Sequence, residues 1–396
     1  MVRGSPLIVY DSAGIEVVDF DLDQLPSAGL VSEAPAWVFG AEAGARHGVP
    51  LSEVRAARLL KDGRVALING IAEELLLVEE DGQEWQRLGS RGEGPGEFSH
   101  ITSVAEEDNG LGVFDEWRRV WVSFRDGEYF DSWEPPPTGV PGLFYPEVVL
   151  PDGEGFYVGD AFLPPGASGG VPTRRLLLLT RVEAGVLDTL AIVPADTGTP
   201  KGVGISILPF GARYALERAD AGVWIGDSAR PEVAFRGRDG AVQRISRWRT
   251  RQSRTLTRRR INEAMEWAIG LVDRSAASAA RLRDTWRETD FPEMVPAWGT
   301  FLLGTDGVLW ISDYAGPEVE LPTPKPHPVQ EWWSIDSAGR PIGKLVSPEG
   351  LEVTGFGRGF LIGIHRDSLD VETLRRYEIK PPPLPDRPVA TGQDGS

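Results

Sequence analysis

Turn signals recur along the chain at a nearly regular interval, and this constrains the fold more than any other feature. Each follows a short run of aliphatic, β-branched or aromatic residues and ends in glycine, as hairpin turns do. The first series consists of Asp62-Gly63, Asp108-Asn109-Gly110, Asp152-Gly153, Asp220-Ala221-Gly222, Asp306-Gly307 and Gly357-Arg358-Gly359. Its members lie 46, 44, 68, 86 and 51 residues apart. A four-stranded propeller blade takes roughly 40 to 50 residues, so the interval predicts one blade per turn, with two blades lengthened by insertions.

A second series of turns lies between the later strands of the same units. It consists of Asp81-Gly82, Asp126-Gly127, Glu183-Ala184-Gly185, Asp239-Gly240 and Ser337-Ala338-Gly339. The two series together predict an all-β fold, a six-bladed β-propeller over residues 34–380.

The N-terminal part of the chain supplies the strand that this count lacks. AWVFG at Ala36 to Gly40 resembles EWQRLG at Glu84 to Gly89, which leaves the first blade. We therefore expect a strand near residue 38 to pair beside Glu372 to Ile379 and to close the ring, which removes an exposed sheet edge. Residues 1–33 form an extension that contains a hairpin over residues 7–20, for which the pattern predicts no place.

Residues 250–290 depart from the strand pattern and predict a helical insertion between blades four and five. Ile261, Met265, Ala268 and Ile269 recur at helical spacing after Thr257, a suitable N-cap. A second helix is expected over residues 275–288. The tail, residues 381–396, is rich in proline without alternating apolar positions, and we expect it to be disordered.

The composition excludes several classes of protein. Lys and Arg number 41 against 59 Asp and Glu among 396 residues, which gives a net charge of −18. A negative field of this size repels phosphate backbones, so nucleic acid is not an expected partner. No stretch reaches the roughly 18 apolar residues of a membrane span, and Met1 to Pro6 does not read as an export signal. The chain has no cysteine, which excludes disulfides and thiolate chemistry.

The longest predicted loops all fall on one side of the propeller, since second-to-third loops and blade connections share a side. Long loops on a rigid scaffold usually build a binding surface. The predicted loops are Glu134 to Glu147, Ala161 to Arg175, Pro194 to Ser206, the helical insertion, and Asp313 to Gln330.

Polar residues recur where the second strands end on this side. They are Asn69, Asp115, Asp160, Asp227 and Asp313. A ring of carboxylates could hold Ca²⁺, which takes six to eight oxygen ligands. The interpretation we favour is local: Asp at a strand end accepts hydrogen bonds from the amides of its own turn.

Eight arginines between Arg244 and Arg260, with no acidic residue among them, reverse the overall charge. They either dock an acidic partner or ligand, or lie against the acidic body of the protein; the two interpretations stay equal. The candidate binding residues are Arg254, Arg258, Arg259, Arg260, Trp267, Trp117 and His365, the last of which is expected at the channel mouth beside Asp367. No catalytic residue is predicted.

GSRGEGPGEF at Gly89 to Phe98, together with DSAGIEVVD at Asp11 to Asp19 and VFDEWRRVWVSF at Val113 to Phe124, resembles bacterial six-bladed β-propellers of the NHL-repeat type. The resemblance covers nearly the whole chain and implies a non-catalytic binding or scaffold protein with a protein partner, or else a small-molecule ligand. It also implies the cell envelope or periplasm, with the cytoplasm as the alternative if no leader was removed. The alternative function is that of a hydrolase or lactonase with a divalent cation such as Ca²⁺ in the central channel.

Overall fold

The computed structural model describes residues 7–40, 49–107, 110–134, 146–149, 156–162, 173–181, 187–201, 204–271, 275–317 and 327–381, with the backbone alone within 146–207 and at residue 271. These residues form an all-β protein of six separate sheets, to which two α-helices are added. We number the sheets 1 to 6 in chain order.

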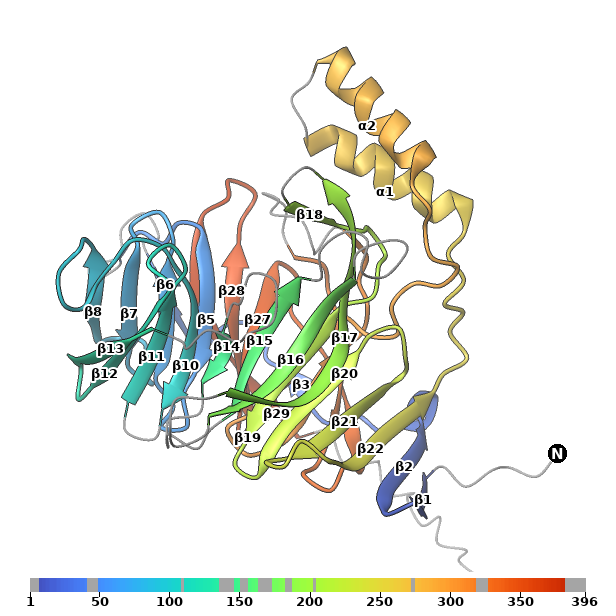
Figure 1. Ribbon diagram of the computed structural model, residues 1–396, viewed down its shortest axis with the longest axis horizontal. Coiled ribbons are helices and arrows are strands. Elements are labelled where there is room, and N and C mark those ends of the chain that lie inside the picture. Colours follow the sequence, from blue (N-terminus) through green and yellow to red (C-terminus); the bar gives the residue numbers. More distant parts are fainter. Residues whose placement is uncertain are drawn as a thin grey trace, which may run out of the picture.

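Each sheet is built around three to five strands that follow one another along the chain (Figure 1), and sheets 4 and 6 each gain two strands from the N-terminal part. Sheet 1 contains β5 (Val54–Leu59), β6 (Val65–Asn69), β7 (Glu74–Val78), β8 (Trp85–Arg91) and β9 (Glu97–Phe98). Sheet 2 contains β10 (Ile101–Glu107), β11 (Gly110–Asp115), β12 (Val120–Arg125) and β13 (Glu128–Trp133). Sheet 3 contains β14 (Pro146–Val149), β15 (Phe156–Phe162), β16 (Thr173–Arg181), β17 (Leu187–Lys201) and β18 (Gly204–Ile207).

The second half of the chain repeats this arrangement. Sheet 4 contains β19 (Tyr214–Ala219), β20 (Gly222–Asp227), β21 (Glu232–Gly237) and β22 (Val242–Arg249). Sheet 5 contains β23 (Phe301–Leu303), β24 (Leu309–Ser312), β25 (Glu331–Ile335) and β26 (Pro341–Val346). Sheet 6 contains β27 (Leu351–Gly357), β28 (Phe360–Arg366) and β29 (Glu372–Lys380).

The predicted turns within the described residues lie between consecutive antiparallel strands, as expected. Gly63, Gly82, Gly127, Gly240, Gly307, Gly339 and Gly359 all have positive φ there. Glycine adopts this left-handed conformation without steric cost, which explains its place in these seven turns. Gly222, which ends the predicted turn at 220–222, does not have a positive φ. The predicted turns at residues 108–109, 152–153 and 183–185 lie outside the described residues.

The N-terminal strand completes sheet 6, as predicted. Strand β4 (Trp37–Phe39) pairs antiparallel with β29, with Phe39 opposite Leu374. The short strand β3 (Leu30–Val31) pairs with the end of β29. Phe39 is buried in one core with Leu374 and with Val65 of sheet 1, so apolar packing joins the first and last sheets.

The hairpin that the sequence could not place extends sheet 4. Strands β1 (Leu7–Ser12) and β2 (Ile15–Asp21) pair with each other, and β2 runs parallel to β22, with Phe20 beside Trp248. Val18 and Phe20 are fully buried, because this face of β2 continues the core face of β22. A short 3-10 helix, Leu22–Gln24, follows.

First strands of successive sheets lie side by side. Strand β5 contacts β10 and β27, β10 contacts β14, and β23 contacts both β19 and β27. Large aromatic side chains fill the space between sheets: Trp248 meets Trp333 with ring centroids 5.2 Å apart, and Trp310 stacks on Phe356 at 4.5 Å. Figure 1 shows the blue strands of sheet 1 next to the red strands of sheet 6.

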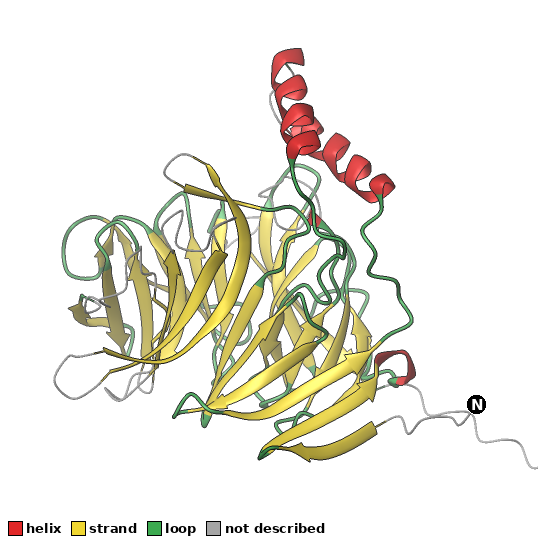
Figure 2. Ribbon diagram, turned by 45° about the vertical axis from the view of Figure 1, so that its right-hand side comes forward, coloured by secondary structure: helices red, strands yellow, loops and turns green. Residues whose placement is uncertain are grey.

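Helices α1 (Arg258–Leu271) and α2 (Ala276–Glu288) confirm the predicted insertion between β22 and β23. Thr257 Oγ1 accepts the Arg260 amide at 3.3 Å, and Ser275 Oγ accepts the Ser278 amide at 3.2 Å, so both helices are capped. Figures 1 and 2 show the pair projecting past the ends of the sheets. Within the described part of the chain, no helix is long and apolar enough to cross a membrane.

The loop expected at Pro194 to Ser206 is wrong, since β17 and β18 pair there, with Gly198 opposite Ile207. Backbone pairing satisfies these amides and overrides the turn-like composition of the segment. Of the other predicted loops, residues 135–145, 163–172 and 318–326 lie outside the described residues, as do residues 382–396 of the predicted tail.

Candidate functional site

The turns between second and third strands lie beside the segments that enter the first strands of the same sheets, and we call this the loop side. Asn69 Oδ1, at the end of β6, accepts the Ser52 amide at 2.9 Å. Asp115, at the end of β11, is fully buried, and its carboxylate accepts the Ser99, His100 and Arg118 amides at 2.7, 3.2 and 3.1 Å. Asp115 therefore holds the chain that enters sheet 2 against the turn that follows β11.

The other predicted strand-end carboxylates also accept backbone amides where they are described. Asp227 Oδ1 accepts the Ala229 amide at 3.0 Å, and Asp313 Oδ1 accepts the Glu331 amide at 3.0 Å. Burial raises the pKa of Asp313 to about 6. Asp160 lies in β15, where only the backbone is described. Among the described residues, no three His, Asp or Glu side chains form a group that could hold a metal ion.

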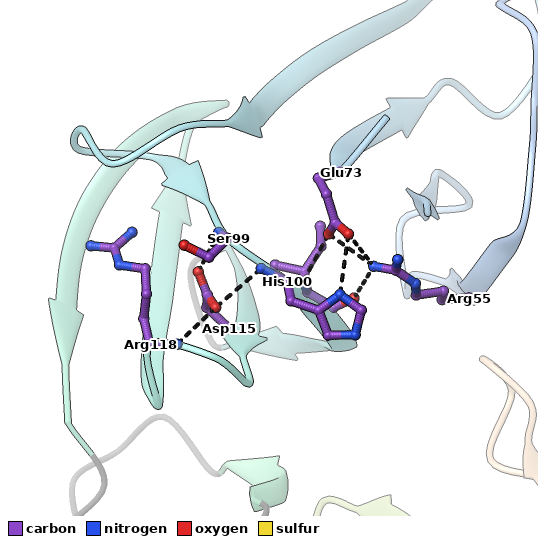
Figure 3. A network of polar contacts seen from close by, with 7 residues as sticks. Arg55, Glu73, Ser99, His100, Asp115 and Arg118 are labelled. Atoms are coloured by element: carbon purple, nitrogen blue, oxygen red, sulfur yellow. Dashed lines mark hydrogen bonds and ion pairs between the residues drawn. The ribbon is translucent and has the colours of Figure 1, made fainter. Parts of the chain in front are cut away.

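A second buried carboxylate, Glu73, organises the loop side of sheets 1 and 2 (Figure 3). It lies in the turn between β6 and β7 and is only 2% exposed. Arg55 Nη1 donates to both of its oxygens at 2.7 and 2.8 Å, the Ile101 amide donates at 3.1 Å, and His100 Nδ1 lies 3.2 Å away. Burial alone would raise the pKa of Glu73, but these hydrogen bonds outweigh it and hold the pKa below its ordinary value.

His100 in turn supports an exposed tryptophan. Its ring stacks on Trp117, with centroids 4.9 Å apart and planes 19° from parallel. Trp117 is 69% exposed in the turn between β11 and β12. The next residue, Arg118, donates from Nη1 to the Glu97 carbonyl at 2.8 Å. Two buried carboxylates therefore hold His100, on whose ring the Trp117 indole stacks. Glu73 contacts the His100 ring, and Asp115 accepts the His100 backbone amide.

Trp117 has counterparts in the neighbouring sheets. Ile71 and Leu369 are 58% and 82% exposed, and each stands two residues after a strand-end acceptor, Asn69 or Asp367, as Trp117 does after Asp115. These three residues, on sheets 6, 1 and 2, are the apolar turn tips.

The turns that carry the apolar turn tips are tied together by equivalent bonds. Glu372 accepts the Val54 amide at 2.8 Å and pairs with Arg366 at 2.7 Å, which repeats in sheet 6 what Glu73 does in sheet 1. In both cases a carboxylate at the start of a third strand holds the first strand of the next sheet. The apolar turn tips therefore stand on one continuous polar framework.

The arginine-rich segment divides into bound and exposed members. Arg254 donates to the Val295 carbonyl at 3.0 Å and to the Ala229 carbonyl at 3.0 Å, so it holds the base of the helical insertion on sheet 4. Three others pair within the chain: Arg244 with Glu16, Arg247 with Glu232 and Arg251 with Asp23. For these residues the intramolecular interpretation describes the contacts.

Residues at the start of α1 remain available on the surface. Arg258 and Arg259 are exposed, and Arg259 forms only a 3.7 Å pair with Glu263 one turn along the helix. Arg260 is half-buried. Arg249 and Arg251 are exposed as well, so four of the eight arginines of the predicted basic patch stay on the surface and the other four are partly buried.

The remaining predicted residues lie inside the protein or against it. Trp267 is partly buried against the core of the helical insertion, beside Trp286 and Phe210. His365 is half-buried near the end of β28, opposite Leu351 and Thr373. The exposed members of the predicted site lie on different sheets: Trp117 is in a turn of sheet 2, whereas Arg258 and Arg259 begin the helix that follows sheet 4.

Sequence reasoning missed Arg55 and Glu73 and treated His100 as an ordinary histidine. A partial signal is present, because an apolar residue stands two places after the acceptor in three of the turns. The contact of Glu73 with Ile101, 28 residues away, leaves no trace in a single sequence.

No family model matches the chain, and no curated protein matches it. A solved structure from Bacteroides fragilis is similar at 10% identity, covers 92% of this chain and 99% of its own, and has a TM-score of 0.49. A member of the DUF4221 family from Bacteroides vulgatus is similar at 8% identity, with 90% and 100% covered and a TM-score of 0.49. A chain of the mitotic checkpoint complex is similar at 9% identity, with 88% and 93% covered and a TM-score of 0.38. The NHL-repeat resemblance stays a prediction.

Proposed function

We propose that this chain is a non-catalytic, six-bladed β-propeller that binds a partner protein through its loop side. Six sheets in chain order, the contacts between their first strands, and the pairing of β4 with β29 all support the ring. The proposal includes the cell envelope as its location, as expected from the family resemblance.

The observation that carries the binding function is the supported but exposed Trp117. An indole that is 69% exposed contributes little to folding, yet His100 and two buried carboxylates hold it in place. Tryptophan and arginine are enriched among the residues that carry most of the binding energy of protein interfaces. An indole in particular buries a large area while only two side-chain torsions become fixed. Exposed Arg118 and Arg119 stand beside Trp117.

The apolar turn tips favour a protein over a small polar ligand. Ile71 and Leu369 offer aliphatic surface without hydrogen-bonding groups, and aliphatic contacts are typical of the core of protein interfaces. The two arginines beside Trp117 suit carboxylates on the partner. We therefore expect a partner surface that combines apolar side chains with acidic ones. The exposed Arg258 and Arg259 would add a second basic contact.

The carboxylates of this side support binding over the hydrolase alternative. Asp115 accepts three backbone amides and Glu73 is bound by Arg55, so both are engaged in holding the chain. Neither is positioned as a free acid or base.

Site-specific photo-crosslinking tests the proposal. A benzoylphenylalanine placed at exposed Arg119, which leaves the Trp117 indole intact, should crosslink one protein in the source cells. The same group placed at Phe130, which is 50% exposed on the outer strand β13, should not crosslink that protein. Equal crosslinking from both positions, or from neither, would count against a docking site at Trp117.

A further inference from the structure

A second set of charged residues lies at the opposite ends of the sheets, where the tight turns after the first strands are found. A cavity of about 650 Å³ opens there. It is lined by residues from the first strands of sheets 1, 2, 4 and 5, among them Leu59, Val104, Leu216 and Leu303. Charged side chains from the same strands, among them Arg58, Glu217 and Arg218, line this cavity together with the apolar ones.

The main contact among these charged side chains is a bidentate ion pair. Arg58 of β5 donates from Nη1 to Glu217 Oε1 at 3.0 Å and from Nη2 to Oε2 at 2.7 Å. Glu217, on β19, is 5% exposed, and its charge raises the pKa of Arg58. The next residue on β19, Arg218, donates to the Glu106 carbonyl of β10 at 3.0 Å. Strand β19 is thus bonded to the first strands of both sheet 1 and sheet 2.

These bonds do not join neighbouring sheets. Strand β5 has β10 and β27 beside it, and β19 has β23 on one side. Sheet 3 stands between sheets 2 and 4 in chain order, and sheets 5 and 6 stand between sheets 4 and 1. The pair of Arg58 with Glu217 therefore joins sheets 1 and 4, which lie three places apart in the series of six.

We propose that Arg58 and Glu217, assisted by Arg218, form a strap that ties sheets 1 and 2 to sheet 4. The strap crosses the space between the first strands at this end, in the wall of the cavity. It also fixes the separation between the two parts of the loop side, the Trp117 turn on sheet 2 and the helices that follow sheet 4. That the strap presents the Trp117 turn and the helices to one partner rests on the proposed function. That the strap holds the sheets together does not depend on it.

Stability alone does not explain such a pair. Well-packed apolar residues of similar volume usually stabilise a protein as much as a buried ion pair does or more, because both charges lose their water. What the two parallel bonds add is a fixed orientation of the two strands. An exposed pair a few residues away, Lys61 with Asp220 at 2.8 Å, offers a control, since its side chains are 64% and 88% exposed and such pairs contribute little.

Spin-label distance measurements on the isolated protein test the strap. The chain has no cysteine, so Arg119→Cys and Arg259→Cys place one label on each part of the loop side. In an otherwise unchanged protein the distance distribution should be narrow. Arg58→Met with Glu217→Leu should broaden it and should speed amide exchange in β5 and β19 relative to the other sheets, because the orientation of the two strands is no longer fixed even where overall stability is kept. Lys61→Met with Asp220→Leu should change neither.

An unchanged distribution and unchanged exchange in the Met/Leu variant would overturn the strap. If that variant does not fold, the exchanged pair Arg58→Glu with Glu217→Arg provides the test, because it restores the ion pair with the charges reversed. A narrow distance distribution in this variant supports the strap, and a broad one contradicts it. No partner is present in these measurements. Failure of the strap is therefore distinguishable from failure of the docking site, which the crosslinking experiment tests.

Discussion

Replacing Glu73 by Gln tests the polar framework beneath Trp117. The substitution keeps the shape of the side chain but leaves Arg55 without its counter-ion. Removing one partner of a buried ion pair costs about 3–5 kcal/mol. Because the Arg55 side chain is 23% exposed, water screens part of the loss, and we expect a decrease of about 2–3 kcal/mol in the free energy of unfolding.

Urea unfolding at neutral pH measures this decrease: the urea concentration at the midpoint of unfolding should fall, while the dependence of the unfolding free energy on urea should stay the same. The pKa of Glu73 is held below its ordinary value of 4.5 in the folded protein. Its stabilisation is therefore complete above pH 4.5 and is lost as the pH falls through the folded pKa. The difference between the wild type and Glu73→Gln should shrink accordingly in acid.

The adjacent Glu74 provides the control. Its carboxylate pairs at 3.0 Å with Arg87, whose side chain is 57% exposed, so Glu74→Gln should cost at most about 1 kcal/mol. Equal losses from the two substitutions would refute the framework that we describe around Glu73.

Three further predictions follow from the fold and the strand-end acids. Phe39→Ala should cost about 3–5 kcal/mol in urea unfolding, because Phe39 is buried between sheets 6 and 1, whereas Leu30→Ala, at an exposed position, should cost under about 1 kcal/mol. Asp313→Asn should stabilise the protein by about 1–2 kcal/mol at pH 8, since burial penalises the charged form, and the gain should shrink as the pH falls below about 6 and vanish below 3.8. Excess EDTA should leave the melting temperature unchanged, because Asp115 and Asp227 bind backbone amides; a fall would favour the hydrolase or lactonase alternative.

Much of the fold was predictable because local chemistry repeats along the chain. Turns that end in glycine mark the strands of the sheets, and Thr257 marks the start of α1, since these residues act within a few positions of themselves. The pairing of residues 36–40 with β29 was also predictable, because one strand was missing from a regular count. The place of the β1–β2 hairpin was not, since its parallel pairing with β22 joins segments more than 200 residues apart along the printed sequence.

The candidate site shows the same division. Local hydrogen bonds were the favoured role for Asp115 and Asp227, and each accepts an amide of its own turn, that of Arg118 or Ala229. The binding role of Trp117 stays a prediction. The partners of Arg254 could not be predicted, because they are carbonyls of Val295 and Ala229 that only the folded insertion brings to it. Glu73 and Arg55 escaped notice for a similar reason, because an isolated acid and an isolated base are common at any surface.

The affinity of the crosslinked partner for purified variants tests the central claim most directly. We expect Trp117→Ala to raise the dissociation constant by about 30-fold or more, as truncating an interface hot spot does. Phe130→Ala, on the outer strand β13, should leave it unchanged. Equal affinities of the two variants for the partner would contradict the account of the loop side as a docking surface built on Trp117.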